Sequence, residues 1–486
     1  MTGKIKYILI IILTVNLAEA SAQNSQAMYF MNIPQNHLIN PAFRPSNSVY
    51  IGLPVVSGIN LNINNNFVNF SDVFIKGQVK DSIITFLHPD YNVDKFLAKL
   101  KDKNFLESES MIQLFGVGFS IGKDGYVFID INERVDGNVV MPGDLFKLAL
   151  KGNEEFVGSR IDLSSLRGDM KYYHEVGMGY SRNITDRLRI GIKGKLLFGI
   201  ADVSIDNGSL GINVNNDYTH LLDADLIVNI SGPVTIFKNS KNDIDSIGFD
   251  DKKIGTTDFL SGKKNMGMGL DIGATYDISD RFKLTASITD LGFIRWKNEV
   301  TNLKAKNQFL FSGLSMDNVL NGTMTFDSVA NLMGESLNNA FKVSDSKRPF
   351  TTWLPFSVTL GGSYNVTKQF SVGLLSYSRV IGKQVREAMT LSANINIGNS
   401  LSASLGYTAE NHQYDNLGAG LAFRAGVTQF YLVTDRIPVM WNRIKNDNSN
   451  IILPENWNTF NLRLGMNLVF GNSVKEKNDK PMIMVE

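Results

Sequence analysis

The chain has 486 residues, 43% of them hydrophobic and 20% charged, with 42 glycines, 12 prolines and no cysteine. The absence of cysteine excludes disulfides, thiolate metal sites and cysteine nucleophiles. The net charge of +1 gives no electrostatic basis for nucleic-acid binding, and a mean hydropathy of −0.06 excludes a bundle of membrane helices. The length suits two or three soluble domains or one large barrel.

The start of the chain has the pattern of a secretory signal peptide. Lys4 and Lys6 form a positive region, residues 7–13 are an unbroken apolar run, and residues 20–22 (Ala-Ser-Ala) form a small-residue cleavage site. The apolar run is too short for the roughly 20 residues of a spanning helix, and Gln23 replaces the cysteine that a lipoprotein would need. We therefore expect export and cleavage, which leaves a mature chain with 46 basic and 46 acidic residues.

The clearest structural signal is strict alternation over residues 459–471. Every second position is apolar: Phe460, Leu462, Leu464, Met466, Leu468 and Phe470. The same period of two recurs over residues 188–200, 266–276 and 389–397. Because side chains alternate between the faces of a strand, each segment has one apolar face and one face that is mostly polar or small. About 11 residues is also the length that a tilted strand needs to cross a bilayer.

The polar faces favour a membrane barrel over a soluble sheet. They consist of Gly, Ser, Thr and Asn with isolated charges, which suits a polar lumen inside apolar rows that face lipid. Past residue 22 no run of 18 apolar residues occurs, so a closed barrel is the structure that could span a bilayer. A large secreted β-sandwich or propeller is the alternative.

Fourteen strands are predicted. They lie near residues 49–64, 113–121, 125–133, 172–181, 187–200, 266–276, 281–290, 356–364, 369–379, 389–397, 400–408, 417–424, 427–434 and 459–470. Linkers after even-numbered strands are short, and four of them repeat one turn pattern that begins at Asn183, Asp277, Asn365 and Asn396. Most linkers after odd-numbered strands are long: 65–112, 134–171, 201–265, 291–355 and 435–458. Bacterial outer-membrane barrels combine an even strand number with short periplasmic turns and long external loops.

The predicted fold is therefore all-β: a transmembrane antiparallel β-barrel of about 14 strands, within a range of 12 to 16. Short helices are expected in its external loops, at residues 94–100, 144–150 and 328–341. The predicted organisation is a signal peptide (1–22), an N-terminal plug or cap segment (23–48), the outer-membrane barrel (49–470) and a periplasmic C-terminal tail (471–486).

Two short motifs carry a resemblance: Leu38-Ile-Asn-Pro-Ala-Phe-Arg-Pro45 and Ser287-Ile-Thr-Asp-Leu-Gly-Phe-Ile-Arg-Trp296. They resemble an uncharacterised outer-membrane barrel family of bacteria that use type IX secretion. That family is similar to the 14-stranded long-chain fatty-acid transporter barrels and to type IX secretion barrels, and the resemblance covers roughly residues 28–470. Within the first motif, Asn40, Pro41, Ala42 and Phe43 are candidates for a plug that fills the lumen. The aromatic Phe470 at the end of the last strand is typical of the signal that the barrel-assembly machinery recognises.

The sequence predicts no enzyme. Its five histidines are His37, His88, His174, His220 and His412. No two of them have the i, i+4 spacing of a helical zinc site, and none lies in a metal-binding motif. We therefore predict no catalytic residue, no metal site and no cofactor.

Isolated charges on the predicted polar faces are candidates for the lumen: Arg189, Lys193, Lys195, Asp271, Lys283 and Arg463. Charges inside a membrane structure are costly unless water or an opposite charge satisfies them. We expect ion pairs across the lumen in preference to a path for a substrate.

Two functions stay open at this stage. The chain could bind or pass a hydrophobic small molecule, which predicts an apolar pocket among the external loops and an opening through the wall or past the N-terminal segment. Alternatively, it is a structural or docking barrel with a sealed lumen, whose loops contact envelope or secretion proteins. Both place it in the outer membrane, in contact with lipid, after cleavage of its signal peptide.

Overall fold

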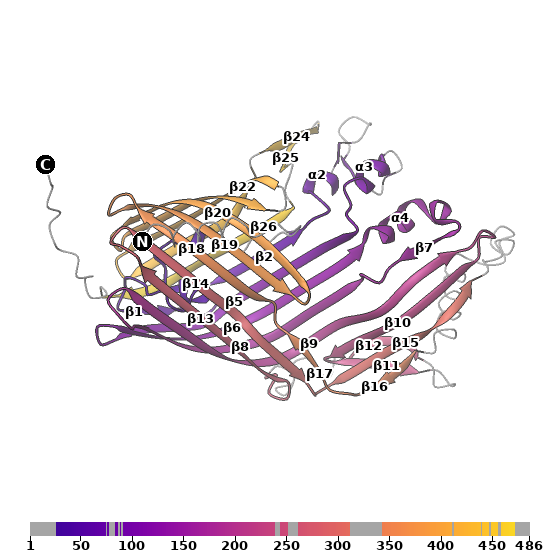
Figure 1. Cartoon of the computed structure of the whole chain (residues 1–486), viewed down its shortest axis with the longest axis horizontal. Coiled ribbons are helices and arrows are strands. Elements are labelled where there is room, and N and C mark those ends of the chain that lie inside the picture. Colours follow the sequence, from indigo (N-terminus) through magenta and orange to yellow (C-terminus); the bar gives the residue numbers. More distant parts are fainter. Residues whose placement is uncertain are drawn as a thin grey trace, which may run out of the picture.

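The computed structural model describes residues 26–471 except 74, 77–82, 86–87, 89–90, 239–243, 251–260, 312–342, 411–412, 439, 447–448 and 455–457. The described residues form a closed antiparallel β-barrel of 14 strands (Figure 1). The first strand is interrupted and consists of β1 (Val49–Gly52) and β2 (Ile59–Asn65). The others are β5 (Lys103–Ile121), β6 (Gly125–Pro142), β8 (Arg167–Asn183), β9 (Leu188–Val214), β13 (Met266–Asp277), β14 (Phe282–Trp296), β18 (Phe356–Asn365), β19 (Phe370–Ile381), β20 (Gln384–Ile397), β21 (Leu401–Glu410), β22 (Gln413–Ala425), β23 (Thr428–Ile437) and β26 (Thr459–Phe470).

The first and last strands close the barrel. Val49 of β1 is paired with Phe470 of β26 on one side and with Phe119 of β5 on the other. β2 continues both pairings, beginning with Ile59 opposite Leu464 and Ile112. Closure gives every wall strand two hydrogen-bonded neighbours, so the barrel has no free edge. The predicted barrel of 14 strands is confirmed.

Several strands run well past their predicted ends, and the long linkers contain β-structure. β9 has 27 residues, and its second half pairs with β10 (His220–Ser231), which also pairs with β15 (Val300–Phe311). Shorter strands join this sheet: β7 (Ser159–Asp162), β16 (Ser344–Ser346) and β17 (Phe350–Trp353). Residues 201–265 and 291–355 were expected as loops because their alternation is irregular. Figure 1 shows β9, β10 and β15 continuing together away from the barrel.

The remaining elements are small. Two-stranded sheets are formed by β3 (Ile75–Lys76) with β4 (Ile83–Ile84), β11 (Val234–Lys238) with β12 (Ile244–Phe249), and β24 (Trp441–Asn446) with β25 (Ser449–Pro454). The helices are η1 (Gln26–Met28), η2 (Pro34–Leu38), α2 (Phe70–Val73), α3 (Val93–Leu97), α4 (Gly143–Lys151) and η3 (Glu154–Phe156). α3 and α4 lie where short helices were predicted, whereas residues 328–341 lie outside the described residues. Among the described helices, none has the length and hydrophobicity that crossing a membrane would require.

A side-chain contact joins the small sheet of β11 and β12 to β16 of the extended sheet. The ammonium of Lys238 donates a hydrogen bond to Asp345 over 2.8 Å. This hydrogen bond favours the ionised carboxylate and lowers the pKa of Asp345.

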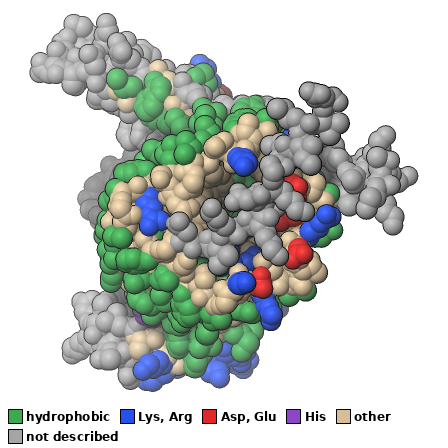
Figure 2. Space-filling model, turned by 90° about the vertical axis from the view of Figure 1, so that its left-hand side faces the viewer, with side chains coloured by type: hydrophobic (Ala, Val, Ile, Leu, Met, Phe, Trp, Pro, Cys, Tyr) green, Lys and Arg blue, Asp and Glu red, His purple; other side chains and the backbone are tan. Residues whose placement is uncertain are grey.

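The outer wall of the barrel is apolar. Exposed side chains on eight of the wall strands include Met178, Ile192, Met268, Leu360, Leu391, Leu405, Leu421 and Leu432. Exposed aromatic side chains lie near the end with the short turns, among them Phe119, Tyr180, Tyr276, Tyr364, Phe423 and Phe430. Figure 2 views the end of the molecule that lies on the left in Figure 1, and there hydrophobic side chains surround a more polar centre. An apolar outside around a polar inside reverses the usual order of a soluble protein.

Candidate functional site

Residues 26–48 lie inside the barrel and form what we call the plug. Its apolar side chains pack on the inner wall, where Met28, Met31 and Ile33 form one buried cluster with Tyr431 and Val433. Polar contacts reach other strands. The Ala27 amide donates to Asp435 (2.9 Å), the Asn32 amide to Ser402 (3.0 Å) and the Gln35 side chain to Asn467 (2.7 Å). Each of these contacts involves a side chain, and at the last residue of the plug the Ser48 carbonyl also accepts the amide of Ser120 in β5 over 2.8 Å.

The four predicted plug residues lie where the plug meets the wall. Asn40 is fully buried and donates to the carbonyl of Ala286 over 3.2 Å, while its own Oδ1 accepts from the Ala42 amide over 2.9 Å. A Cβ at Gly191 would lie 2.2 Å from the backbone of Pro41, so the plug touches the wall backbone there. The ring of Phe43 packs edge-on against Tyr29 within the plug.

His37 joins the plug to β6. Its Nε2 lies 2.9 and 3.0 Å from the two carboxylate oxygens of Asp130, and its Nδ1 lies 2.6 Å from the carbonyl oxygen of Pro34. Both ring nitrogens thus face oxygen acceptors, and each contact is a hydrogen bond when that nitrogen carries a proton. Lys193 approaches the same carboxylate to 3.1 Å.

A network of buried ion pairs crosses the lumen next to the plug, and we call it the ion-pair layer. Its members are Glu107, Glu109, Asp130, Arg134, Glu175, Lys193, Lys195, Asp271, Asp290, Arg379 and Arg386. Arg134 of β6 contacts Glu109 (3.3 Å), Glu175 (3.1 Å) and Asp290 (2.8 Å), which connects β6 to three other strands. These charges are shielded from solvent, where an ion pair is favourable when its geometry and hydrogen bonds are good.

Asp290 shows how the wall is shaped to build this layer. Its φ is +64°, a left-handed conformation that non-glycine residues rarely adopt. Asp271 accepts the Asp290 amide over 2.7 Å, and the Asp290 carboxylate contacts Lys195 at 2.6 Å and Arg134 at 2.8 Å. The register of β13 and β14 shifts here, which is a β-bulge in β14. The hydrogen bond from the Asp290 amide to Asp271 holds the bulge, and the Asp290 carboxylate points into the ion-pair layer.

The six predicted lumen charges divide by depth. Lys193, Lys195 and Asp271 belong to the ion-pair layer, and Arg463 is buried beside it. Arg189 lies near the short turns and donates to Ser181 over 3.0 Å. Lys283 is at the same end of the barrel, with a side chain 42% exposed and 3.7 Å from Asp277.

Sequence reasoning missed most partners of these cations. Glu107 and Glu109 fell in a predicted loop, and Arg134 fell one residue past a predicted strand. Arg379 and Arg386 lie near the strand ends farthest from the short turns. For the two glutamates, the signal that could have indicated a strand is the period of two, because Ser108, Glu109 and Ser110 continue the alternation of β5.

A cavity of about 50 Å³ lies between the plug and the ion-pair layer. Leu38 and Ile39 of the plug line one side, and Arg134, Lys195 and Arg463 are among the charged side chains on the other. A space of this size holds a few waters or one small ion.

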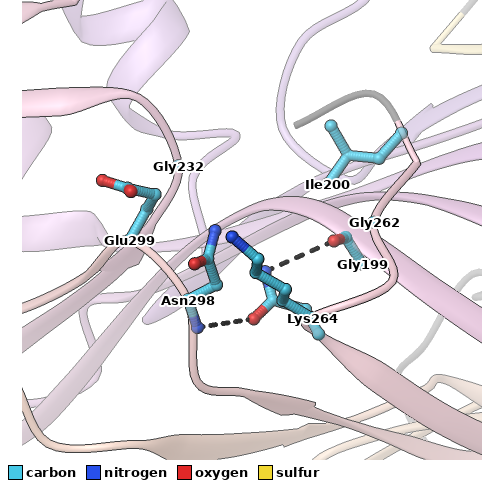
Figure 3. Close-up of a pocket in the computed structure, with 8 residues that line it drawn as sticks. Gly199, Ile200, Gly232, Gly262, Lys264, Asn298 and Glu299 are labelled. Carbon is cyan, nitrogen blue, oxygen red and sulfur yellow. Dashed lines mark hydrogen bonds between the residues drawn. The ribbon is translucent and has the colours of Figure 1, made fainter. Parts of the chain in front are cut away.

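A second pocket lies in the wall, where β9 changes its neighbour. β9 pairs with β13 up to Phe198, opposite Met266, and with β10 from Asp202, opposite Ser231. We call this place the fork. Gly199, Ile200, Gly232, Gly262, Lys264, Asn265, Asn298 and Glu299 line its pocket (Figure 3).

Asn265 holds the fork together. Its carbonyl oxygen accepts the Gly199 amide over 2.7 Å, and its side-chain oxygen accepts the amides of Lys297 and Asn298 at 2.9 Å each. Its side-chain nitrogen donates to Gly199 and to Ser231 at 3.3 Å. The hydrogen bonds of Asn265 therefore take the place of regular β-ladder bonds where the strands separate at the fork. The part of the chain that the structure describes holds no group of three or more His, Asp or Glu side chains arranged for a metal ion.

These features define a class: a 14-stranded antiparallel barrel with a plugged lumen. The chain belongs to a family of unknown function, DUF5723, whose model matches residues 41–435. No curated protein matches the sequence.

Several solved barrels are similar to this chain at low identity. The toluene transporter TbuX of Ralstonia pickettii is 10% identical, with 94% of this chain and 100% of that chain covered and a TM-score of 0.41. A FadL homologue of Pseudomonas aeruginosa is 10% identical, with 94% and 98% covered and a TM-score of 0.41. The translocator domain of the autotransporter NalP from Neisseria meningitidis is 7% identical, with 88% and 90% covered and a TM-score of 0.32. Likeness at this level does not extend to function.

Proposed function

We propose that the protein is an outer-membrane barrel that passes a hydrophobic small molecule through its wall at the fork. The apolar outer wall supports a membrane location, because Leu391, Leu405 and Met178 would each face water in a soluble protein. A closed barrel also satisfies every wall backbone group internally, as a bilayer requires.

A route along the barrel axis is unfavourable for an apolar molecule. Such a molecule would meet the plug and then the ion-pair layer, where Arg134 and Lys195 are buried among carboxylates. Separating a buried charge from its ionic partner costs about 3–5 kcal/mol. The proposed route therefore leaves the lumen sideways.

The observation that carries the proposal is an apolar cluster directly inside the fork. Tyr173, Leu197, Ile294, Trp296, Val300 and Leu354 are all buried there. A Cβ at Gly199 would lie 2.4 Å from the Trp296 ring, so the indole lies against the wall backbone where β9 leaves β13. At the fork the β-ladder of the wall is interrupted, and apolar side chains gather on the inner face of the wall at the same place.

A disulfide staple across β9 and β13 tests the route, and the absence of native cysteine makes it clean. Leu196 and Met268 are directly opposite, point outward and lie next to the fork. The variant L196C/M268C is expressed in a Gram-negative host, and uptake of a labelled monoaromatic hydrocarbon is measured with and without reductant. We expect uptake in the reduced state and loss of it on oxidation.

The matched control is L374C/L391C, which staples β19 to β20 at two exposed and paired positions away from the fork. Its uptake is expected to be the same in both redox states. Equal inhibition by both staples would contradict a route at the fork. Uptake no higher than in cells without the protein would reject transport altogether.

A docking barrel is the second candidate, and one observation favours it. β5, β6, β8 and β9 have 17 to 27 residues, well beyond the roughly 9–11 that span a bilayer. Their extensions have their own core, in which Phe156, Ile161, Leu163 and Val214 are buried. Rejection of transport, together with co-purification of an envelope or secretion protein that is lost when this extension is altered, would favour docking.

A further inference from the structure

We propose that the cavity between the plug and the ion-pair layer is a binding site for a small monovalent anion, with Arg463 as its main anchor. The inference does not depend on transport through the wall, because it rests on the chemistry of a cavity inside the barrel.

Arg463 is the starting point because its guanidinium is buried with few acceptors. The residue is 5% exposed and lines the cavity. Its Nε donates to the Asn60 side-chain oxygen over 3.3 Å, and its Nη1 lies 3.8 Å from the sulfur of Met28. A guanidinium has five N–H donors. Within the described residues, no carboxylate lies within ion-pair distance of Arg463.

The neighbouring cations each have a carboxylate within ion-pair distance, which Arg463 does not have among the described residues. Arg134 contacts Asp290 at 2.8 Å, Lys195 contacts the same carboxylate at 2.6 Å, and Arg379 contacts Glu109 at 3.1 Å. The carboxylates around the cavity are thus already engaged by other cations. A buried charge with few hydrogen-bond partners is unfavourable, and an anion in the cavity would satisfy the remaining donors of Arg463.

The charges that line the cavity favour an anion. Its described lining contains the carboxylates of Glu109, Glu175 and Asp290 and the cations Arg134, Lys195, Arg379 and Arg463. Among these lining groups cations outnumber carboxylates by one, and Asp271 and Glu107, just outside the lining, pair with Lys195 and Arg379 and not with Arg463. Arg463 would repel a cation bound in the cavity and attract an anion.

Size and polarity narrow the class of ligand. About 50 Å³ admits a halide or a short carboxylate such as formate or acetate, and it is too small for a nucleotide or a fatty acid. Thr289 and Ser357 contribute hydroxyls to the lining, while Leu38, Ile39 and Met111 contribute apolar surface. Because Leu38 and Ile39 belong to the plug, an anion here would lie between the apolar surface of the plug and Arg463 of the wall.

The direct test uses the full-length protein in detergent, crystallised in bromide. Anomalous scattering is expected to show a bromide ion in the cavity, in contact with Arg463. A cavity that holds water alone at high bromide concentration would overturn the proposal, and this measurement needs no variant.

A solution test supplies the affinity. Bromide replaces gluconate at constant ionic strength, and the thermal unfolding midpoint is followed for the wild type, R463Q and R463K. Stabilisation by bromide is expected in the wild type, and the apparent affinity is expected to weaken by about tenfold or more in R463Q, because a charged hydrogen bond is lost. R463K keeps the charge and is expected to lie between the two.

The control is R424Q. Arg424 also lies inside the barrel, but its donors are occupied by Asn47 (2.9 Å) and by the carbonyls of Gly426 and Val469 (2.7 and 3.1 Å), away from the cavity. Its response to bromide is expected to equal that of the wild type. An identical bromide response in R463Q and the wild type would overturn the assignment of Arg463.

Discussion

At the scale of single residues, Glu175 is where the buried charges converge. Lys193 approaches it at 3.0 Å, Arg134 at 3.1 Å and Lys195 at 3.9 Å. E175Q keeps the shape of the side chain but leaves these cations short of one negative charge. We expect it to lower the free energy of unfolding by about 3–5 kcal/mol, measured by urea titration of protein refolded into lipid vesicles.

Lys283 is the matched comparison. It was also predicted to face the lumen, but its side chain is partly exposed near the short turns, 3.7 Å from Asp277. K283Q is expected to change the free energy of unfolding by less than about 1 kcal/mol, since exposed ion pairs contribute little. Equal losses in E175Q and K283Q would mean that the ion-pair layer is wetter than the structure shows.

At the scale of elements, the contact between the plug and β9 depends on one glycine. A Cβ at Gly191 would lie 2.2 Å from Pro41, whereas a Cβ at Gly194 would meet nothing within 4 Å. G191V is therefore expected to displace the plug, and G194V is expected to leave it in place. The measurement is maleimide labelling of a cysteine at Ala42, which is fully buried.

Labelling of A42C alone is expected to be slow. In A42C/G191V it is expected to accelerate by about tenfold or more, which corresponds to a decrease of roughly 1.4 kcal/mol in the free energy of exposing the buried site. In A42C/G194V it is expected to stay slow. Both valines are on the same strand, so a difference between them reports the plug and not the strength of β9. Fast labelling in all three proteins would show that the plug does not fill the lumen.

At the scale of the whole molecule, the outer wall distinguishes a membrane barrel from a soluble one. Leu391 is 55% exposed near the middle of β20. L391R would change little in water, but at the midplane of a bilayer it is expected to cost about 2–4 kcal/mol. I184R, in a short turn, is expected to cost no more than about 1 kcal/mol, because it lies near the interface.

The same urea titration in vesicles gives both values. A neutral L391R, or recovery of the wild type in the soluble periplasmic fraction, would contradict the outer-membrane location. The domain boundaries and the cleavage after residue 22 stay predictions, and N-terminal sequencing of the exported protein would test them.

How far the sequence predicted the barrel depends on the side chains of each segment. In β26 apolar Phe460, Leu462 and Leu464 alternate without exception, so both the strand and its outward face could be predicted. β5 begins with charged and polar residues around Glu107 and Glu109, so its first half was taken for a loop. The plug was predicted as a segment, but no local pattern indicates that His37 meets Asp130, 93 positions away.

By itself the sequence determined the class of fold, because a period of two with apolar rows is a local property that each strand carries alone. It also indicated which faces turn inward, and so predicted Lys193, Lys195 and Asp271 as candidates for the lumen. Only the tertiary structure decided how these charges are satisfied, where β9 exchanges β13 for β10, and that Arg463 has no carboxylate of the described residues within ion-pair distance. Those outcomes depend on distances across the lumen, which closure of the barrel sets and which no single strand encodes.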